Sequence, residues 1–319
     1  MPLLCVAVNA AIDKTYVVSG FQAGGTYRLE TTVAVAGGKA LNVAKTARLL
    51  GVAEVTCTGL VAGRTGDWIR KDLAKRGIRE AFLEVTGESR EDILVVDPAA
   101  GQETRLLEPG VPVEAFAVEA LIARVEELAG DSDLVVLAGS LPRGVPVDAY
   151  ARMVQAIRRR SVRAFLDADG EALRRAVAEG PDLVKLNQAE FEELVGHRVA
   201  GPEELVACGR GALRRGALVV TLGGRGAVWI GPEAALLAEA PPVTPLMTVG
   251  SGDAFLGGYA AAVLCGDDPP RALALGVAAG TANTLCLGPG VVDLGSVEAL
   301  RKQIRVAPVG MGATERKLA

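Results

Sequence analysis

A glycine-rich turn that carries one carboxylate is the clearest chemical feature of this chain. It lies in the segment Thr248–Tyr259, T-V-G-S-G-D-A-F-L-G-G-Y, and continues directly into an apolar stretch that favours a helix. Backbone N–H groups at a helix start lack partners and lie at the positive end of the helix dipole, which suits phosphate oxygens. A carboxylate there repels phosphate, but it can accept a proton from a hydroxyl that attacks phosphorus. The pattern predicts a phosphate-binding turn with Asp253 as general base; a plain glycine-rich helix cap is the alternative.

A second glycine-rich helix start lies near the N-terminus, in A-G-G-K-A-L-N. Gly37 and Gly38 allow a ligand to approach the backbone closely, and Lys39 and Asn42 project from the first turn of the following helix. The segment is not a Walker P-loop, because G-x-x-x-x-G-K-[ST] is absent. It predicts an anion-binding site, with a plain helix cap as the alternative.

Other polar residues follow predicted strands, and ligands of open parallel sheets bind beyond the carboxyl ends of their strands. Asn9 and Asp13 follow the first strand. The Asp13 carboxylate could accept hydrogen bonds from sugar hydroxyls, or it could be a solvated loop residue. Ser140, in L-A-G-S-L-P, ends a further strand and fits a ligand contact or a structural turn. No G-x-G-x-x-G follows the first strand, which argues against a nicotinamide dehydrogenase.

The segment K-L-N-Q-A-E, from Lys185 to Glu190, has two compatible interpretations. Asn187 and Glu190 are three residues apart and would share a helix face, where their oxygens suit Mg²⁺ through water. They also fit a capping box, in which the two side chains cap the helix reciprocally. Farther on, Val220–Gly226 reads as a strand and a glycine turn suited to lie against a nucleotide. The D-A-D-G that begins at Asp167 predicts helix capping rather than a calcium site.

Composition narrows the functional classes. The chain has 319 residues, half of them hydrophobic, and a formal net charge of −4 with both signs scattered, so a nucleic-acid partner is not expected. The N-terminus lacks a basic leader, and the longest apolar stretch, Ala254–Cys265, is interrupted by glycines, so we expect no membrane segment. Five cysteines without a C-x-x-C predict a reduced, cytoplasmic protein without structural zinc. The single histidine, His197, is expected to be a surface residue, which assigns acid–base chemistry to carboxylates or lysines.

Apolar, β-branched runs alternate with helical patterns, which predicts one α/β domain over 1–319 with a mainly parallel sheet and helices on both faces. We expect strands at 3–8, 55–60, 134–137, 162–166, 183–185 and 218–222, and helices at 39–50, 67–76, 117–129, 148–159 and 203–215, with long helices in the C-terminal third. The tail 310–319 is expected to be frayed.

Two segments break this alternation. Residues 14–35 and 82–108 are rich in β-formers with a two-residue period, and Asp97-Pro98 and Gly101 predict a hairpin in the second segment. We expect antiparallel strands forming a small inserted sheet that serves as a lid over a site or as a dimer interface. Because such a sheet would expose its edges and one face, we expect substrate or a partner to cover it.

Taken in order, these motifs resemble the ribokinase-like carbohydrate kinases of the phosphofructokinase B branch, over almost the whole chain. The most specific matches are A-G-G-K-A-L-N-V-A and T-V-G-S-G-D-A-F-L-G-G, supported by N-A-A-I-D-K, G-S-L-P-R-G-V-P, K-L-N-Q-A-E and V-T-L-G-G-R-G-A. The resemblance implies a three-layer α/β/α fold with a β lid, ATP and Mg²⁺ as cofactors, and Asp253 as catalytic base. It further implies the following sites: an anion hole at Gly250, Ser251 and Gly252; nucleotide contacts at Lys185, Asn187, Thr221, Gly223, Gly226, Asn283 and Gly288; and a magnesium association at Asn187 and Glu190.

Within that family the N-terminal motifs look like kinases of phosphorylated ketohexoses. The resemblance implies that lid residues Arg28, Arg90 and Arg105, with Lys39, hold the substrate's own phosphate, and that Asp13 and Asn42 orient sugar hydroxyls. The family's usual T-R-x-N is S-R-E-D here, and its G-G-K-G is G-G-K-A. We expect a homodimer through the lid and fructose 1-phosphate as lead substrate. A ketohexose 6-phosphate is the alternative within the family, and a non-catalytic sugar- or nucleotide-binding regulator is the alternative outside it.

Overall fold

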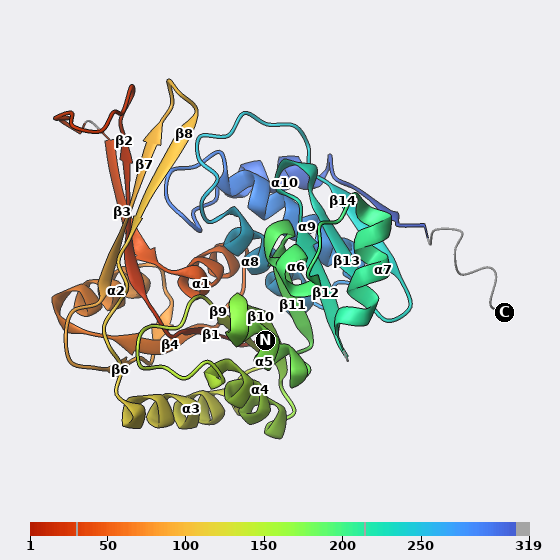
Figure 1. The fold of residues 1–319 in the computed structure, drawn as a ribbon, viewed down its shortest axis with the longest axis horizontal. Coiled ribbons are helices and arrows are strands. Elements are labelled where there is room, and N and C mark those ends of the chain that lie inside the picture. The colour runs from red at the N-terminus through yellow and green to blue at the C-terminus, as the bar shows by residue number, and fades with distance from the viewer. Residues whose placement is uncertain (30, 214, 311–319) are drawn as a thin grey trace.

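The computed structural model describes residues 1–29, 31–213 and 215–310, and its core is a large twisted sheet between two helical layers (Figure 1). The strands of this sheet follow the order β15-β14-β13-β12-β11-β10-β9-β1-β4-β5, with β6 paired to β4. Their bounds are β1 (Leu3–Ala7), β4 (Val55–Val61), β5 (Arg79–Glu80), β6 (Leu83–Glu84), β9 (Leu134–Ala138), β10 (Arg163–Asp167), β11 (Leu183–Asn187), β12 (Ala217–Thr221), β13 (Ala227–Ile230), β14 (Ala235–Glu239) and β15 (Arg305–Pro308). Strands β1, β4, β5, β6 and β9 to β12 pair in parallel, and β13 to β15 pair antiparallel.

Helices cover both faces of the sheet. One layer consists of α3 (Ala115–Ala129), α4 (Ala149–Arg159), α5 (Gly170–Ala178), α6 (Gln188–Val195) and α7 (Pro202–Ala212); the other consists of α1 (Lys39–Leu49), α2 (Gly63–Lys75), α8 (Ser251–Leu264), α9 (Pro269–Asn283) and α10 (Leu294–Arg301). Strand β1 is apolar at every position because both its faces are covered: Leu4 and Val6 join the first core, whereas Leu3 and Cys5 join the second. A parallel strand covered on both faces has no solvent side.

A second sheet, the lid, projects from one end of the main sheet (Figure 1). Its strands are β2 (Ala11–Val17), β3 (Thr31–Gly37), β7 (Arg90–Asp97) and β8 (Gln102–Leu107), in the order β3-β2-β7-β8. The expectation of a purely antiparallel lid is wrong, because β2 and β7 pair in parallel. Each of these strands follows a strand of the main sheet along the chain, so both run outward from it. Residues 83–84 belong to the main sheet, which makes the second lid segment shorter than the predicted 82–108.

The predicted fold class is confirmed, and most expected strands and helices lie within one to three residues of the observed bounds. The predicted hairpin joins β7 to β8. The antiparallel strands β13, β14 and β15 are not among the expected strands, whereas the helix starts expected at the D-A-D-G segment and at Asn187 correspond to α5 and α6. The helix expected at 203–215 ends at Ala212. Of the tail expected to fray, residues 311–319 lie outside the described residues.

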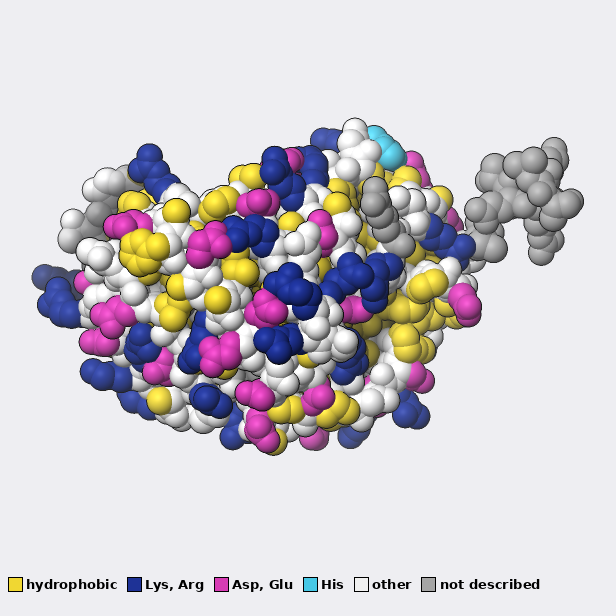
Figure 2. Space-filling view, turned by 90° about the horizontal axis from the view of Figure 1, so that it is seen from below, with side chains coloured by type: hydrophobic (Ala, Val, Ile, Leu, Met, Phe, Trp, Pro, Cys, Tyr) yellow, Lys and Arg dark blue, Asp and Glu magenta, His cyan; other side chains and the backbone are white. Residues whose placement is uncertain are grey.

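The surface carries interspersed charges. Basic and acidic side chains alternate with apolar ones over the face drawn in Figure 2. His197 is exposed, as expected, with its Nε2 3.5 Å from Sγ of Cys208. Among the residues that the structure describes, no helix is both long and apolar enough to cross a membrane.

Candidate active site

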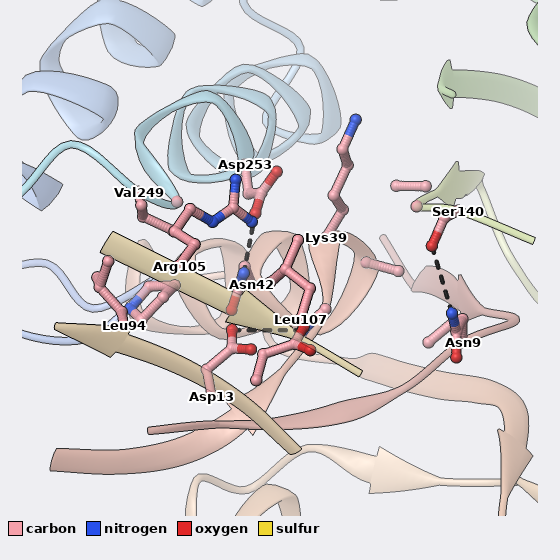
Figure 3. Close-up of a pocket in the computed structure, with 18 of the residues that line it drawn as sticks. Asn9, Asp13, Lys39, Asn42, Leu94, Arg105, Leu107, Ser140, Val249 and Asp253 are labelled. Carbon is pink, nitrogen blue, oxygen red and sulfur yellow. Dashed lines mark hydrogen bonds between the residues drawn. The ribbon is translucent and has the colours of Figure 1, made fainter. Parts of the chain in front are cut away.

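The first turn of α8 lies between two cavities. A polar cavity of about 410 Å³ opens between the lid and the carboxyl ends of the central strands, and both Gly250 and Asp253 line it (Figure 3). A more apolar cleft of about 290 Å³ lies between the turn after β12 and helices α8 and α9, and both Ser251 and Gly252 line it. The amides at the start of α8 therefore face a boundary between two spaces of different chemistry.

Asp253 lies at the base of the polar cavity. Asn42 donates a hydrogen bond from Nδ2 to Oδ2 of Asp253, at 2.8 Å, across 211 residues of sequence (Figure 3). Both side chains are buried, and Oδ1 of Asn42 has no partner in the part of the chain that the structure describes. Burial raises the pKa of Asp253 to about 6, and the nearby Asp167 charge adds to this increase, while Lys185, Lys39 and Asn42 oppose it. A carboxylate with this pKa is suited to accept a proton near neutral pH.

Asp167 holds two lysines beside Asp253. It is fully buried at the end of β10, and Nζ of both Lys39 and Lys185 lies 2.7 Å from its carboxylate. Burial alone would raise the Asp167 pKa, but the two lysines lower it below the ordinary value. Burial opposes the Lys39 charge in the same way, yet Asp167, Glu190 and Asp253 together raise its pKa. The cluster therefore keeps two cations at the cavity base.

The turn before α8 has a backbone that only glycine adopts easily. Gly250 has φ 85°, and a Cβ there would lie 2.7 Å from Pro289. The Pro289 carbonyl in turn accepts a hydrogen bond from Nζ of Lys45 at 2.7 Å, and the same ammonium donates to the Ala36 carbonyl at 2.6 Å. Burial lowers the pKa of Lys45 to about 8. Lys45 thus connects the base of the lid to the loop that supports the α8 turn.

The second glycine turn receives the carboxylate of Asp13. A Cβ at Gly37 would lie 2.1 Å from Cγ of Asp13, so this position must lack a side chain. The Gly38 amide lies 3.4 Å from Oδ2 of Asp13. Across the cavity, Nδ2 of Asn9 lies 3.3 Å from the hydroxyl of Ser140 (Figure 3). These groups present hydrogen-bonding atoms to the cavity.

The lid contributes two arginines of different character. Arg90 is paired with Asp92, with Nη1 2.8 Å from Oδ2. Arg105 is exposed and extends into the cavity, and it has no hydrogen bond or ion pair in the described part of the chain (Figure 3). Nearby, Glu103 of β8 accepts a hydrogen bond from the Thr248 hydroxyl at 3.1 Å, which joins the lid to the segment before α8.

Asn187 and Glu190 form the predicted capping box. The Glu190 amide donates to Oδ1 of Asn187 at 2.9 Å, and the Asn187 amide donates to Oε2 of Glu190 at 2.8 Å. Both residues also line the polar cavity, and Oε1 of Glu190 lies 3.5 Å from Nζ of Lys39. Among the described residues no group of three or more His, Cys, Asp or Glu side chains could hold a metal ion. The magnesium interpretation stays a prediction beside the observed cap.

Most predicted site residues line one of the two cavities. The polar cavity is lined by Asp13, Gly38, Lys39, Asn42, Arg90, Arg105, Ser140, Lys185, Asn187, Glu190, Gly250 and Asp253, and the apolar cleft by Thr221, Gly223, Gly226, Ser251 and Gly252. Four other predicted residues line neither space: Gly37, Arg28, Asn283 and Gly288. Gly37 lies beneath Asp13, and Arg28 is exposed before β3. Asn283 is buried and donates to the carbonyls of Gly288, at 3.2 Å, and Val291, at 2.7 Å, so it holds the loop that precedes α10.

The sequence analysis missed the roles of Asp167 and Asp92. The D-A-D-G segment was expected to cap a helix, and Asp169 is the N-cap residue of α5, without a side-chain hydrogen bond, whereas Asp167 pairs with Lys39 and Lys185. Its position at the carboxyl end of a central strand, the criterion applied to Asp13, was the available signal. Asp92 lies opposite Asp13 in the parallel pairing of β2 with β7, which no local pattern indicates.

The chain is similar to known carbohydrate kinases over most of its length. Residues 1–293 match the model of the pfkB family of carbohydrate kinases. A 1-phosphofructokinase from Rhodobacter capsulatus is 35% identical over 267 residues, which cover 82% of this chain and 84% of that protein. A tagatose-6-phosphate kinase from Staphylococcus epidermidis is 27% identical over 312 residues, covering 96% of this chain and 100% of that protein.

A solved structure has the same architecture. The phosphofructokinase-2 from Escherichia coli in complex with substrates and products matches with a TM-score of 0.88 and 26% identity, over 95% of this chain and 99% of that one. These relatives resemble the chain over most of its length.

Proposed function

Because the chain belongs to the pfkB family of carbohydrate kinases, we propose that it transfers the terminal phosphoryl group of ATP to a hydroxyl of a phosphorylated ketohexose, with fructose 1-phosphate as lead substrate and fructose 1,6-bisphosphate as product. The observation that carries this proposal is the first turn of α8, where Asp253 faces the polar cavity while Ser251 and Gly252 face the apolar cleft. A sugar in the first space and a nucleotide in the second would meet at this turn. The retained carboxylate argues against a non-catalytic regulator.

The proposed mechanism assigns a step to each group. Asp13 and Asn42 orient the sugar, and the unpartnered Oδ1 of Asn42 supports this role because a hydroxyl could donate to it. Asp253 accepts the proton of the attacking sugar hydroxyl. At the same time the hydroxyl oxygen forms the new bond to phosphorus, and the bond from phosphorus to the oxygen of ADP breaks. The amides of residues 250–252 stabilise charge on the transferred group. Positioning and electrostatics supply most of the catalysis in such a transfer.

We include Mg²⁺ in the proposal because the cavity offers oxygen donors from Asn187 and Glu190. Oxygen donors suit this ion, but Oδ1 of Asn187 and Oε2 of Glu190 already serve the capping box. The residues present fit an ion that nucleotide phosphates and water would mainly hold, and Glu190 and Asn187 would reach it through water. When bound, Mg²⁺ neutralises phosphate charge. Lys39 and Lys185, held by Asp167, add positive charge on the protein side of the same cavity.

The choice of substrate rests on the lid. Arg90 of β7 and Arg105 of β8 both line the polar cavity, which supports a contact with a phosphate carried by the substrate. The test is an ATP-coupled assay across fructose 1-phosphate, fructose 6-phosphate, tagatose 6-phosphate and free fructose. We expect the highest kcat/KM with fructose 1-phosphate. A preference for a 6-phosphate substrate would show that the enzyme is a ketohexose-6-phosphate kinase of the same family. Equal use of free fructose would exclude the proposed contact between the lid arginines and a substrate phosphate.

We also propose a homodimer formed through the lid. The strand pairing places Leu106 opposite Ile93, on the face of the lid opposite to Arg105, and Leu106 is 57% exposed and does not line the polar cavity. An apolar lid face of this kind and the two edge strands β3 and β8 suit a second copy of the same surface. Light scattering at working concentration tests the proposal, and a monomer would contradict it.

A further inference from the structure

A carboxylate lies where the lid is proposed to hold the substrate's phosphate. Asp92 and Asp13 are register partners on the parallel strands β7 and β2, so their side chains lie on the same face of the lid. Both line the polar cavity together with Arg90 and Arg105. A site that binds a phosphate dianion would gain nothing from a second anion at this position, because like charges repel.

The Asp92 carboxylate already forms an ion pair with the guanidinium of Arg90. Nη1 of Arg90 lies 2.8 Å from Oδ2 and 3.0 Å from Oδ1 of Asp92, and the two side chains are only 11% and 12% exposed. The same guanidinium donates to the Asn9 carbonyl at 3.2 Å and to the Glu108 carbonyl at 3.3 Å. Arg90 thus has three protein acceptors before substrate arrives, whereas Arg105 has none within the described residues.

We propose that Asp92 is a specificity-determining residue that weakens binding of the substrate's own phosphate, because its carboxylate competes with that phosphate for Arg90. The inference rests on the proposed function and deepens it. A phosphate can form bidentate, charge-assisted hydrogen bonds with a guanidinium only where the donors are available. With Asp92 charged, Arg105 is the one of the two arginines lining the cavity whose side-chain donors are free in the described structure, and the carboxylate repels the incoming dianion.

The charges around Asp92 make this competition dependent on pH. Burial raises the pKa of Asp92 to about 6; Arg90 on its own strand lowers it, Asp13 on β2 raises it, and the Glu108 amide and Arg105 on β8 lower it. A raised carboxyl pKa means that Asp92 is charged above about pH 6 and neutral below it. Protonation therefore frees Arg90, and affinity for an anion at the lid should rise as the pH falls through this value.

The experiment compares Asp92→Asn with wild type. The variant keeps the shape of the side chain and removes its charge, so the KM for fructose 1-phosphate should fall by about tenfold or more, the scale of one hydrogen bond to a charged group. The KM for ATP and kcat should move much less. Asp131→Asn is the matched control, because Asp131 is exposed after α3 and lies outside both cavities. Asp92→Ser provides a second neutral variant if the asparagine variant does not fold.

Sulfate provides an independent readout, because it stays a dianion from pH 5 to 8 while sugar phosphates titrate. Its inhibition constant, measured in competition with the sugar phosphate, should fall in wild type as the pH is lowered through about 6. Asp92→Asn should lose this part of the pH dependence, whereas Asp131→Asn should keep it.

The outcomes separate the two proposals. If wild type uses no sugar phosphate in preference to free sugars, the proposed function fails whatever the variants do. If wild type uses fructose 1-phosphate but Asp92→Asn leaves its KM unchanged or raises it, the proposed function stands and the competition is wrong, because Asp92 then serves to orient Arg90. A lower KM together with a flattened sulfate profile establishes Asp92 as the residue that sets phosphate affinity.

Discussion

The base of the polar cavity and its lid end are built in different ways. At the base, Asp253, Asn42 and Asp167 are buried and joined by hydrogen bonds and ion pairs between elements far apart in the sequence. At the lid end, Arg105 is exposed and Leu107 is 54% exposed. The base rests on two hydrophobic cores, whereas the lid joins the second core through Ile12 of β2 and Ala36 of β3 and otherwise packs on a small cluster around Met247.

This difference separates the chemistry from the choice of substrate. Charges fixed in a buried site stabilise a reaction without reorganising, so changes at the base should alter kcat or stability. Side chains on an exposed lid adapt to a ligand, so changes there should alter KM. The following experiments test that separation, beginning with the largest expected effect.

Asp253→Asn should have the largest effect. The change preserves the hydrogen-bonding shape at the cavity base but removes the proton acceptor, so kcat should fall by about 10²–10⁴-fold with the KM for ATP nearly unchanged. Steady-state kinetics with both substrates measures this. A variant that keeps more than about a tenth of wild-type kcat would falsify the assignment of Asp253 as base.

Asp167→Asn should affect stability as well as rate. It removes the ion-pair partner of Lys185, whose side chain is 4% exposed. Removing one partner of a buried ion pair costs about 3–5 kcal/mol, and Tm should fall by about 5 °C or more. Differential scanning calorimetry is the measurement, with the exposed ion-pair variant Glu126→Gln as control. Equal Tm values for the two variants would mean that the ion pairs of Asp167 with Lys39 and Lys185 do not stabilise the fold at the cavity base.

Arg105→Ala should change binding without changing the chemistry. Its guanidinium extends into the cavity, so the variant should lose charged hydrogen bonds to the substrate's phosphate. At about 1.5–3 kcal/mol for such a bond, KM for the sugar phosphate should rise about 10- to 150-fold, and kcat and the KM for ATP much less. Arg175→Ala, on the exposed surface of α5, is the control. A loss confined to kcat would show that Arg105 acts in the chemical step, with the residues at the cavity base, and not in substrate binding at the lid.

The local motifs of both regions could be read from the sequence. Glycines at 37, 38 and 250 mark tight turns before helices, and the capping box at Asn187 needs only residues within one helical turn. These signals depend on neighbours along the chain, which is why the predicted turns and helix starts agree with the structure. The predicted α/β architecture is confirmed for the same reason, because the alternation of strands and helices is a local pattern.

Contacts set by topology could not be read in this way. Asp167 has partners 128 and 18 residues away, on α1 and β11, whereas its local D-A-D-G pattern indicates a cap. The pairing of Asp92 with Asp13 depends on the parallel register of β2 and β7. Strands β13 to β15 are short and edge the sheet, so their apolar runs carry little signal against the neighbouring turns.

The pH dependence of kcat should reflect the raised pKa of the buried catalytic base, Asp253. Because the pKa of Asp253 is raised to about 6 and the base must be ionised, kcat at saturating substrate should rise about tenfold between pH 5 and 7 and level off above. The Asp167 charge contributes to this raised pKa, so Asp167→Asn should move the acid limb to lower pH, whereas Asp131→Asn should leave it in place. A rate independent of pH over this range contradicts the assigned base.

The smallest effect on turnover should come from the outer face of the lid. Leu106 is 57% exposed, and alternation along β8 places it on the opposite face from Arg105, so it does not face the polar cavity. If two lids pack through this face, Leu106→Asp places two charges in an apolar interface, and light scattering should report a monomer. Leu294→Asp changes a similarly exposed leucine at the start of α10 and should leave the oligomeric state unchanged. Because the base of the cavity is untouched, kcat of the Leu106 variant should stay within about threefold of wild type, the range of ordinary surface substitutions. A monomer with a far larger loss of kcat would show that the lid face contributes to the chemistry, and the division between base and lid would then have to be abandoned.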